Sequence, residues 1–85
     1  LEAQGVRRVL CVPGESYLPV LAALDGSSVQ AVVCRHEGVA SMAAEATGKL
    51  TGRPGVALVT RGPGASNAAS GVHVAQQDST PMVLL

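Results

Sequence analysis

The 85-residue sequence predicts an α/β fold with three layers, in which right-handed β-α-β crossovers connect the strands of a parallel sheet. Three observations lead to this prediction. Short apolar runs lack the alternation of half-exposed strands, segments with helical periodicity separate these runs, and turns rich in Gly and Pro mark the boundaries. Strands that are buried on both faces and alternate with helices are typical of parallel sheets.

The first half of the chain contains two predicted strands with a helix between them. The apolar run 9–12 is closed by Pro13-Gly14, which indicates a strand followed by a turn. The leucines of 18–24 recur with helical spacing, and Ser16 is placed to cap this helix. Residues 29–34 then predict a second buried strand.

The second half begins with the strongest helical pattern of the sequence. Its predicted apolar face consists of Val39, Met42, Ala43, Ala46 and Leu50, and Gly52 with Pro54 ends the helix. The remaining predicted elements are a strand over 56–59, a helix of small residues over 65–75, a loop over 78–81 and a strand over 82–85.

Composition excludes several classes of protein. Hydrophobic residues make up 47% of the chain, which is too many for a disordered protein. Six Lys and Arg balance six Asp and Glu, so no basic field exists for nucleic acid or a membrane surface. No apolar run approaches the length of a membrane span. Cys11 and Cys34 lie in apolar runs and are interpreted as core residues rather than metal ligands, so a cytoplasmic protein is expected.

The core must be built without large aromatic side chains. Tyr17 is the only aromatic residue, so Val, Leu and Ala must fill the interior, and the elements must pack very closely. Ten glycines permit such close packing. The chain also begins at Leu1 without Met and stops within an apolar run, which predicts an excerpt of a longer protein.

Ligands of open parallel sheets bind outside the carboxyl ends of the strands. Three predicted turns meet at this edge: 13–16 (PGES), 35–38 (RHEG) and 60–64 (TRGPG). The glycine-rich turn lacks the third glycine of a dinucleotide fingerprint and the Lys of a P-loop. A tight turn is therefore favoured over a phosphate cradle for 62–64, and candidate functional residues are sought in all three turns.

Glu37 is the strongest candidate, and the residues themselves leave two interpretations of it open. It either complements the dipole at the start of a helix or is a carboxylate in apolar surroundings that shares a proton with a ligand. The neighbouring turn residues favour structural roles. His36 is expected to be a loop histidine, Arg35 a surface partner of Glu37 or Glu15, and Glu15 with Ser16 a cap of the first helix.

Five segments occur together in one order and spacing. They are 12–15 (VPGE), 35–38 (RHEG), 44–52 (AEATGKLTG), 59–67 (VTRGPGASN) and 75–82 (AQQDSTPM). Together they resemble the amino-terminal, pyrimidine-binding domain of thiamine diphosphate-dependent enzymes. The sequence is most like the acetolactate (acetohydroxyacid) synthase group, with relatives among 2-oxoacid decarboxylases, pyruvate oxidases and aldehyde lyases.

The resemblance implies a catalytic role for Glu37. In the family, the glutamate at this position hydrogen-bonds ring nitrogen 1′ of the aminopyrimidine and favours the imino tautomer that deprotonates thiazolium carbon 2. The activated cofactor then attacks a 2-oxoacid such as pyruvate. The resemblance also implies that backbone and small side chains line the pyrimidine pocket. The residues it assigns to this pocket are Pro13, Gly14, Thr60, Gly64 and Asn67.

The resemblance further implies that residues 1–85 form part of an amino-terminal domain whose middle and carboxyl-terminal domains lie elsewhere. The carboxyl-terminal domain holds Mg²⁺ and the diphosphate, usually across a homodimer or homotetramer, and the middle domain binds FAD in some members. Glu15 departs from the small residue common in acetolactate synthases. Decarboxylases of the family have an acidic residue there, so Glu15 is expected near the substrate, and carboligation and decarboxylation both stay open.

Two hypotheses from other classes also stay open. A nucleotide-binding module of Rossmann type would need an acidic residue at the end of the second strand, where Arg35 stands instead. A non-catalytic interaction domain could keep the fold without the cofactor, and the presence of Glu37 argues against it.

Overall fold

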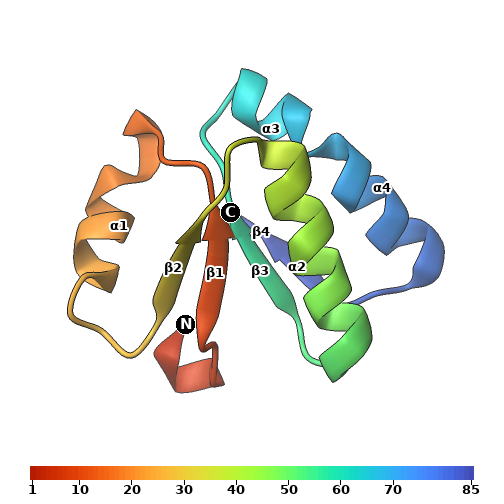
Figure 1. The fold of residues 1–85 in the computed structure, drawn as a ribbon, viewed down its shortest axis with the longest axis horizontal. Helices are drawn as coiled ribbons and strands as arrows, with labels where there is room; N and C mark the ends of the chain where they lie inside the picture. The colour runs from red at the N-terminus through yellow and green to blue at the C-terminus, as the bar shows by residue number, and fades with distance from the viewer.

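A computed structural model describes all residues 1–85 and contains one four-stranded parallel sheet with the strand order β2-β1-β3-β4 (Figure 1). The strands are β1 (Arg8–Cys11), β2 (Gln30–Val33), β3 (Gly55–Leu58) and β4 (Met82–Leu84). The helices are α1 (Leu18–Leu24), α2 (Glu37–Thr51), α3 (Pro63–Asn67) and α4 (Ala69–Asp78), with short 3₁₀ turns η1 (Glu2–Gln4) and η2 (Glu15–Tyr17). The predicted parallel α/β fold is confirmed. None of these helices has the length and hydrophobicity needed to cross a membrane.

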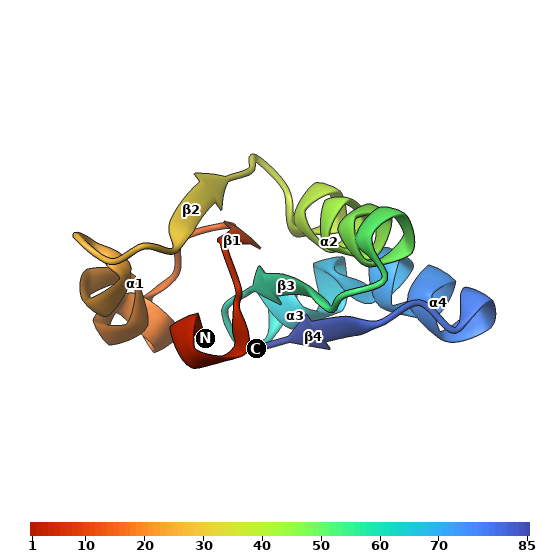
Figure 2. The same ribbon diagram turned by 90° about the horizontal axis from the view of Figure 1, so that it is seen from below.

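Helices cover both faces of the sheet, which gives the predicted three layers (Figure 2). On one face, α1 packs over a cluster that includes Val9, Cys11 and Leu58. On the other face, α2 packs over Leu10 and Ala57 through its own alanines, and α4 lies against α2. Successive residues of β1 and β3 point to opposite faces, so both strands contribute to both layers of the core.

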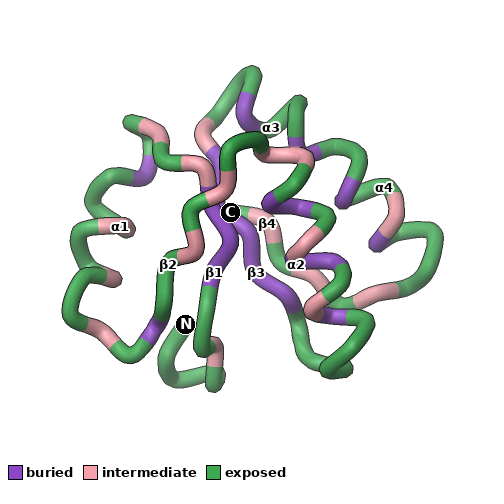
Figure 3. The backbone as a smooth tube through the Cα atoms, in the orientation of Figure 1, coloured by how far each residue is buried: buried purple, intermediate pink, exposed green.

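The strand β2 is less buried than the sequence predicts. Residues 29–34 were expected to form a buried strand, but Gln30, Ala31 and Val33 are exposed (Figure 3). β2 lies at the edge of the sheet and has β1 as its only neighbour. On one face of the sheet, α2 covers β1, β3 and β4 rather than β2. On the other face, α1 has no buried residue. Neither helix layer therefore buries β2 fully.

The predicted apolar face of α2 is wrong except at Ala43, which packs against the core. Val39, Met42 and Leu50 are exposed, Leu50 by 86%, whereas the helix buries the small and polar residues Ala40, Ser41, Ala44, Glu45 and Gly48. The physical reason is distance, because small side chains allow the helix axis to approach the sheet and α4. Closely packed backbones gain dispersion attraction along the whole contact.

Three glycines show how close this approach is, as the shortage of aromatic residues predicts. A Cβ atom at Gly55 of β3 would overlap the carbonyl group of Ala44 in α2. A Cβ atom at Gly71 of α4 would overlap Ser41, and one at Gly48 would overlap the carbonyl oxygen of Pro81. Glycine is therefore required at these contacts for lack of space.

One charged residue is buried at the same interface. Glu45 of α2 accepts a hydrogen bond from Thr80 Oγ1 (2.8 Å) and pairs with Lys49 Nζ (3.0 Å). Lys49 also bridges to Asp78 at the end of α4 (2.6 Å), and these hydrogen bonds to Asp78 and Glu45 raise the pKa of Lys49. The network ties α2 to the end of α4 and to the loop before β4.

Two smaller expectations need correction. Ser16 does not cap the first helix, because η2 extends the turn to Tyr17 and no side chain caps α1. The helix predicted over 65–75 is two helices, α3 and α4, separated at Ala68. The amide of Ala68 lies 3.2 Å from both the Gly64 and Ala65 carbonyl oxygens, which tightens the turn and ends the regular α3 pattern.

Candidate functional site

The strand order places a topological switch point between β1 and β3. The chain leaves β1 toward β2 on one side and returns to β3 on the other, so the turns that follow β1 and β3 meet at the carboxyl edge of the sheet. Gly14 and Thr60 lie in these two turns. A Cβ atom at Gly14 would lie 2.5 Å from Thr60 Cβ, and Ser16 Oγ lies 2.9 Å from Thr60 Oγ1.

The hydroxyl group of Tyr17 connects the same two turns. This buried hydroxyl donates to the Val12 carbonyl oxygen and lies 3.3 Å from the Leu58 carbonyl oxygen. Burial, together with the nearby acidic groups of Cys11 and Glu37, raises the pKa of Tyr17 to about 12. The hydroxyl thus keeps its proton at neutral pH and holds the ends of β1 and β3 together as a hydrogen-bond donor.

The third turn brings Glu37 to this edge at the first position of α2. His36 is the N-cap residue, with an extended backbone (φ −151°), and its Nδ1 accepts a hydrogen bond from the Gly38 amide at 2.9 Å. The predicted loop histidine is therefore a helix cap. Glu37 itself is half-buried, and the start of α2 directs its side chain toward α3.

The two oxygens of Glu37 lie in different surroundings. Oε2 accepts a hydrogen bond from Asn67 Nδ2 at 3.2 Å. Oε1 has no hydrogen-bond partner and lies 3.4 Å from the position that a Cβ atom of Gly64 would occupy. Gly64 is buried, and the Thr60 methyl group lies on its other side, 2.8 Å from the same Cβ position. The site therefore contains a carboxylate with one engaged oxygen and one free oxygen beside a glycine.

The structure brings together most of the predicted site residues. The direct contacts described above link Gly14, Glu37, Thr60, Gly64 and Asn67. Pro13 is exposed in the turn before Gly14, and Glu15 is exposed at the start of η2. Neither forms a hydrogen bond or an ion pair with Glu37.

Arg35 does not play the expected part. It is exposed and forms no ion pair with Glu37 or Glu15, since both ion pairs of the structure belong to Lys49. Arg35 lies in the bend between β2 and α2, before the capping His36. The prediction of an ion pair between Arg35 and Glu37 is wrong because the side chain of Glu37 turns toward α3.

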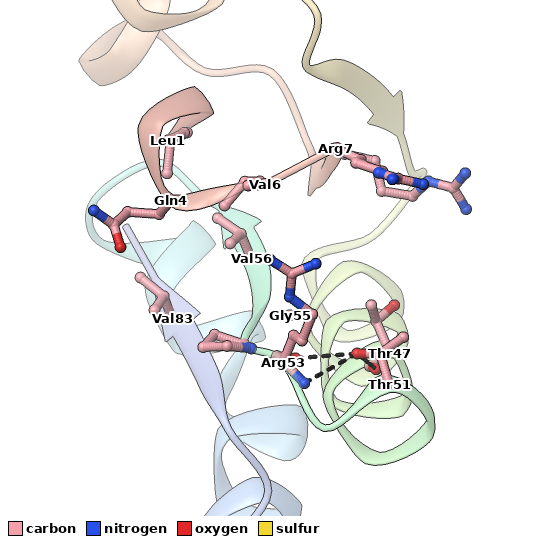
Figure 4. Close-up of a pocket in the computed structure, with 13 residues that line it drawn as sticks. Leu1, Gln4, Val6, Arg7, Thr47, Thr51, Arg53, Gly55, Val56 and Val83 are labelled. Carbon is pink, nitrogen blue, oxygen red and sulfur yellow. Dashed lines mark hydrogen bonds between the residues drawn. The ribbon is translucent and has the colours of Figure 1, made fainter.

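A hollow of about 560 Å³ lies at the opposite, amino edge of the sheet (Figure 4). Its lining includes Arg7, Arg53, Thr51 and Val83, and it contains none of the predicted site residues. Arg53 is held at the end of α2, where its amide donates to Thr51 Oγ1 at 3.1 Å. Because ligands of parallel sheets bind at the carboxyl edge, the candidate site is assigned to the cluster around Glu37.

Sequence reasoning missed three contributors to this site. Ser16 contacts Thr60, Tyr17 joins the two turns, and His36 caps α2. Tyr17 carried a usable signal, because a single aromatic residue a few positions after a strand is a natural filler for a core of small side chains. The Ser16 contact joins residues 44 positions apart and could not be inferred from local spacing.

The fold and the residue cluster around Glu37 define a doubly wound α/β domain with two glycines and one carboxylate at its topological switch point. Residues 1–85 match the family described as the thiamine pyrophosphate enzyme, N-terminal TPP binding domain. The chain belongs to this family.

Alignments with three curated relatives extend over the whole chain. It is 46% identical over 85 residues to a catabolic acetolactate synthase of Raoultella terrigena and 46% identical to an acetolactate synthase of Bacillus subtilis. It is also 42% identical over 85 residues to a 2-hydroxyacyl-CoA lyase 2 of Mus musculus. The chain spans 15% of the length of the first two relatives and 13% of the third. Family membership thus rests on the full chain, which corresponds to a small part of each relative.

Proposed function

We propose that this chain is the pyrimidine-binding part of a thiamine diphosphate-dependent enzyme that acts on 2-oxoacids, as an acetolactate synthase does. The observation that carries the proposal is the free oxygen Oε1 of Glu37 at the switch point of a domain of this family. The relatives named as acetolactate synthases support this reaction, and pyruvate is the expected substrate. The 2-hydroxyacyl-CoA lyase relative favours a lyase as the second candidate function.

The residues present fit the aminopyrimidine of thiamine diphosphate. Oε1 of the half-buried Glu37 makes no hydrogen bond within the chain, so this oxygen is available to a ring nitrogen of a ligand. Gly14 and Gly64 allow the Thr60 side chain to lie close to both turns, because a Cβ atom at either glycine would lie within 3 Å of it. A flat ring is proposed to pack against this surface beside Glu37. Pro13, Gly14, Thr60, Gly64 and Asn67 are proposed to form the walls of this pocket.

Thiamine diphosphate supplies an electron sink for decarboxylation of the substrate when it is bound. Glu37 contributes a carboxyl group that holds a proton at Oε1, toward the ring nitrogen. Asn67 keeps Oε2 engaged, and Tyr17 and Thr60 hold the two turns at a fixed separation. The pocket is built on strand ends and a helix start, so the carboxyl group is oriented before the ligand binds.

Further cofactor sites are proposed in domains of the enzyme outside residues 1–85. Mg²⁺ and the diphosphate are proposed to be held by a carboxyl-terminal domain of the same enzyme, across a homodimer or homotetramer. FAD is a further proposed cofactor of a middle domain. We place the enzyme in the cytoplasm, in keeping with the two free cysteines of the chain.

Titration of the full-length enzyme with thiamine diphosphate and Mg²⁺ tests the proposal by isothermal calorimetry. Saturable binding of thiamine diphosphate with no binding of NAD is the expected result. Binding of NAD alone would favour a nucleotide-binding module instead. Binding of neither would indicate an interaction domain, and each of these two outcomes would overturn the proposed function.

Glu15 is proposed to act on the substrate rather than on the cofactor. It begins η2 directly after the first turn, is exposed, and forms no hydrogen bond with Glu37. We expect Glu15→Gly to shift the ratio of aldehyde to acetolactate-type product while cofactor affinity changes by no more than a few fold. Product analysis by chromatography checks this. Lost cofactor binding with an unchanged product ratio would contradict the assignment.

A further inference from the structure

We infer that Asn67 is a positioning residue that directs the reactive proton of Glu37 to Oε1, an inference that rests on the proposed function. Asn67 is the last residue of α3 and supplies the only hydrogen bond to the Glu37 side chain, from 30 positions away in the sequence. The expectation from the sequence places Asn67 in contact with the cofactor. The geometry points to a role through Glu37.

The direction of the hydrogen bond carries the inference. A carboxylate can only accept from a side-chain amide, so the amide group that faces Glu37 is the donating NH₂ of Asn67. Because Oε2 accepts this bond, a proton bound by Glu37 resides on Oε1. Without Asn67 neither oxygen would accept a side-chain hydrogen bond, and rotation of the carboxyl group could carry the proton away from Gly64.

The backbone around Asn67 keeps the donor in place. The carbonyl oxygen of Asn67 lies 3.4 Å from the Cβ position of Gly38, in the first turn of α2. The next residue, Ala68, is fully buried. The end of α3 is therefore packed against the start of α2, and the exposed side chain of Asn67 extends from it to Glu37.

A close contact with Thr60 explains why a glycine stands at position 64, because a Cβ atom there would lie 2.8 Å from the Thr60 methyl group. Gly64 and Asn67 both belong to α3, and they lie beside different oxygens of Glu37. The helix thus supplies a hydrogen-bond donor to Oε2 and none to Oε1. One short element selects which oxygen remains available to a ligand.

The first test observes the contact in the cofactor-free enzyme. We expect the side-chain amide resonances of Asn67, followed by NMR, to shift as Glu37 ionises in the wild type and to stay constant in Glu37→Gln. His36 and Tyr17 are the neighbouring titratable groups and are retained in Glu37→Gln, so any response that they cause persists in that variant. Amide resonances that titrate identically in both proteins would overturn the inference.

The second test is a double-mutant cycle. Loss of one hydrogen bond to a charged group predicts that Asn67→Leu lowers kcat about 10–100-fold, with the KM for thiamine diphosphate changed by no more than a few fold. Combined with Glu37→Gln, it should cause no further loss, because Asn67 acts through Glu37. Ser66→Ala, an exposed neighbour on α3, is the control and should retain wild-type kcat.

A third variant guards against a folding defect. Asn67→Asp keeps the shape of the side chain, removes the donor, and should lower kcat at least as much as Asn67→Leu. Wild-type kcat in Asn67→Leu or Asn67→Asp beside an impaired Glu37→Gln would overturn this inference alone, as would additive losses in the double variant. Undiminished kcat in Glu37→Gln would overturn the proposed function and this inference with it.

Discussion

Glu37→Gln in the full-length enzyme is expected to lower kcat about 10²–10⁴-fold, the usual contribution of a positioned acid–base group. The amide oxygen of Gln can still accept the hydrogen bond from Asn67, so the shape of the site is preserved. The amide cannot exchange a proton with a ring nitrogen, so the chemical step is lost. Proton exchange at thiazolium carbon 2, followed by NMR, measures that step directly.

The matched control is Glu2→Gln, the same change at a carboxylate in η1, near the amino edge of the sheet. It should leave both exchange and turnover at wild-type values. The melting temperatures of both variants should stay close to that of the wild type, because a Gln at the first turn of α2 loses only a small helix-dipole contribution. Wild-type exchange in Glu37→Gln would refute the assignment of Glu37.

The order of the elements could be predicted because each strand and turn has a local signature. Apolar runs, helical spacing and Gly or Pro at the boundaries placed all four strands within one or two residues of their bounds. The parallel arrangement followed from alternation of strands and helices. The exposure of β2 did not follow, because it depends on its position at the edge of the sheet, which local pattern does not determine.

The buried face of α2 could not be predicted from hydrophobicity alone. Spacing favoured Val39, Met42 and Leu50, but the packed face consists of small residues opposite glycines of β3 and α4. Such a face is decided by pairs of residues on different elements. The shortage of aromatic side chains indicated close packing without indicating which face would be packed.

The candidate site, like the fold, could be predicted from the sequence only in part. The three turns at the carboxyl edge and Glu37 followed from strand order and chemistry, and the resemblance to thiamine diphosphate enzymes added Gly14, Thr60, Gly64 and Asn67. The long-range partners within the site, such as Tyr17 with Leu58, are brought together only when two distant turns meet. Their roles depend on tertiary geometry.

Gly55→Ala is expected to destabilise the 85-residue chain by about 3 kcal/mol or more, at the upper end of overpacking effects. Gly55 begins β3, and its amide donates to the Pro81 carbonyl oxygen at 3.2 Å, so the strand cannot move without disturbing β4. The added Cβ would meet the backbone of Ala44, which cannot rotate away as a side chain could. To make room, α2 would have to leave the sheet and uncover the cluster of Leu10, Ala40 and Ala57.

The stabilisation that alanine gives by restricting the unfolded chain is smaller than the destabilisation caused by this overlap. Alanine restricts the unfolded chain more than glycine does, which stabilises a protein by only about 0.4–1 kcal/mol where the site accepts the side chain. Urea unfolding followed by circular dichroism should therefore show a markedly lower midpoint. Gly26→Asn is the control: Gly26 has φ +78° and open space around its Cβ position, and Asn tolerates this conformation. A Gly55→Ala midpoint equal to that of Gly26→Asn would mean that α2 is free to move away from β3, and that the small-residue interface does not determine how this domain packs.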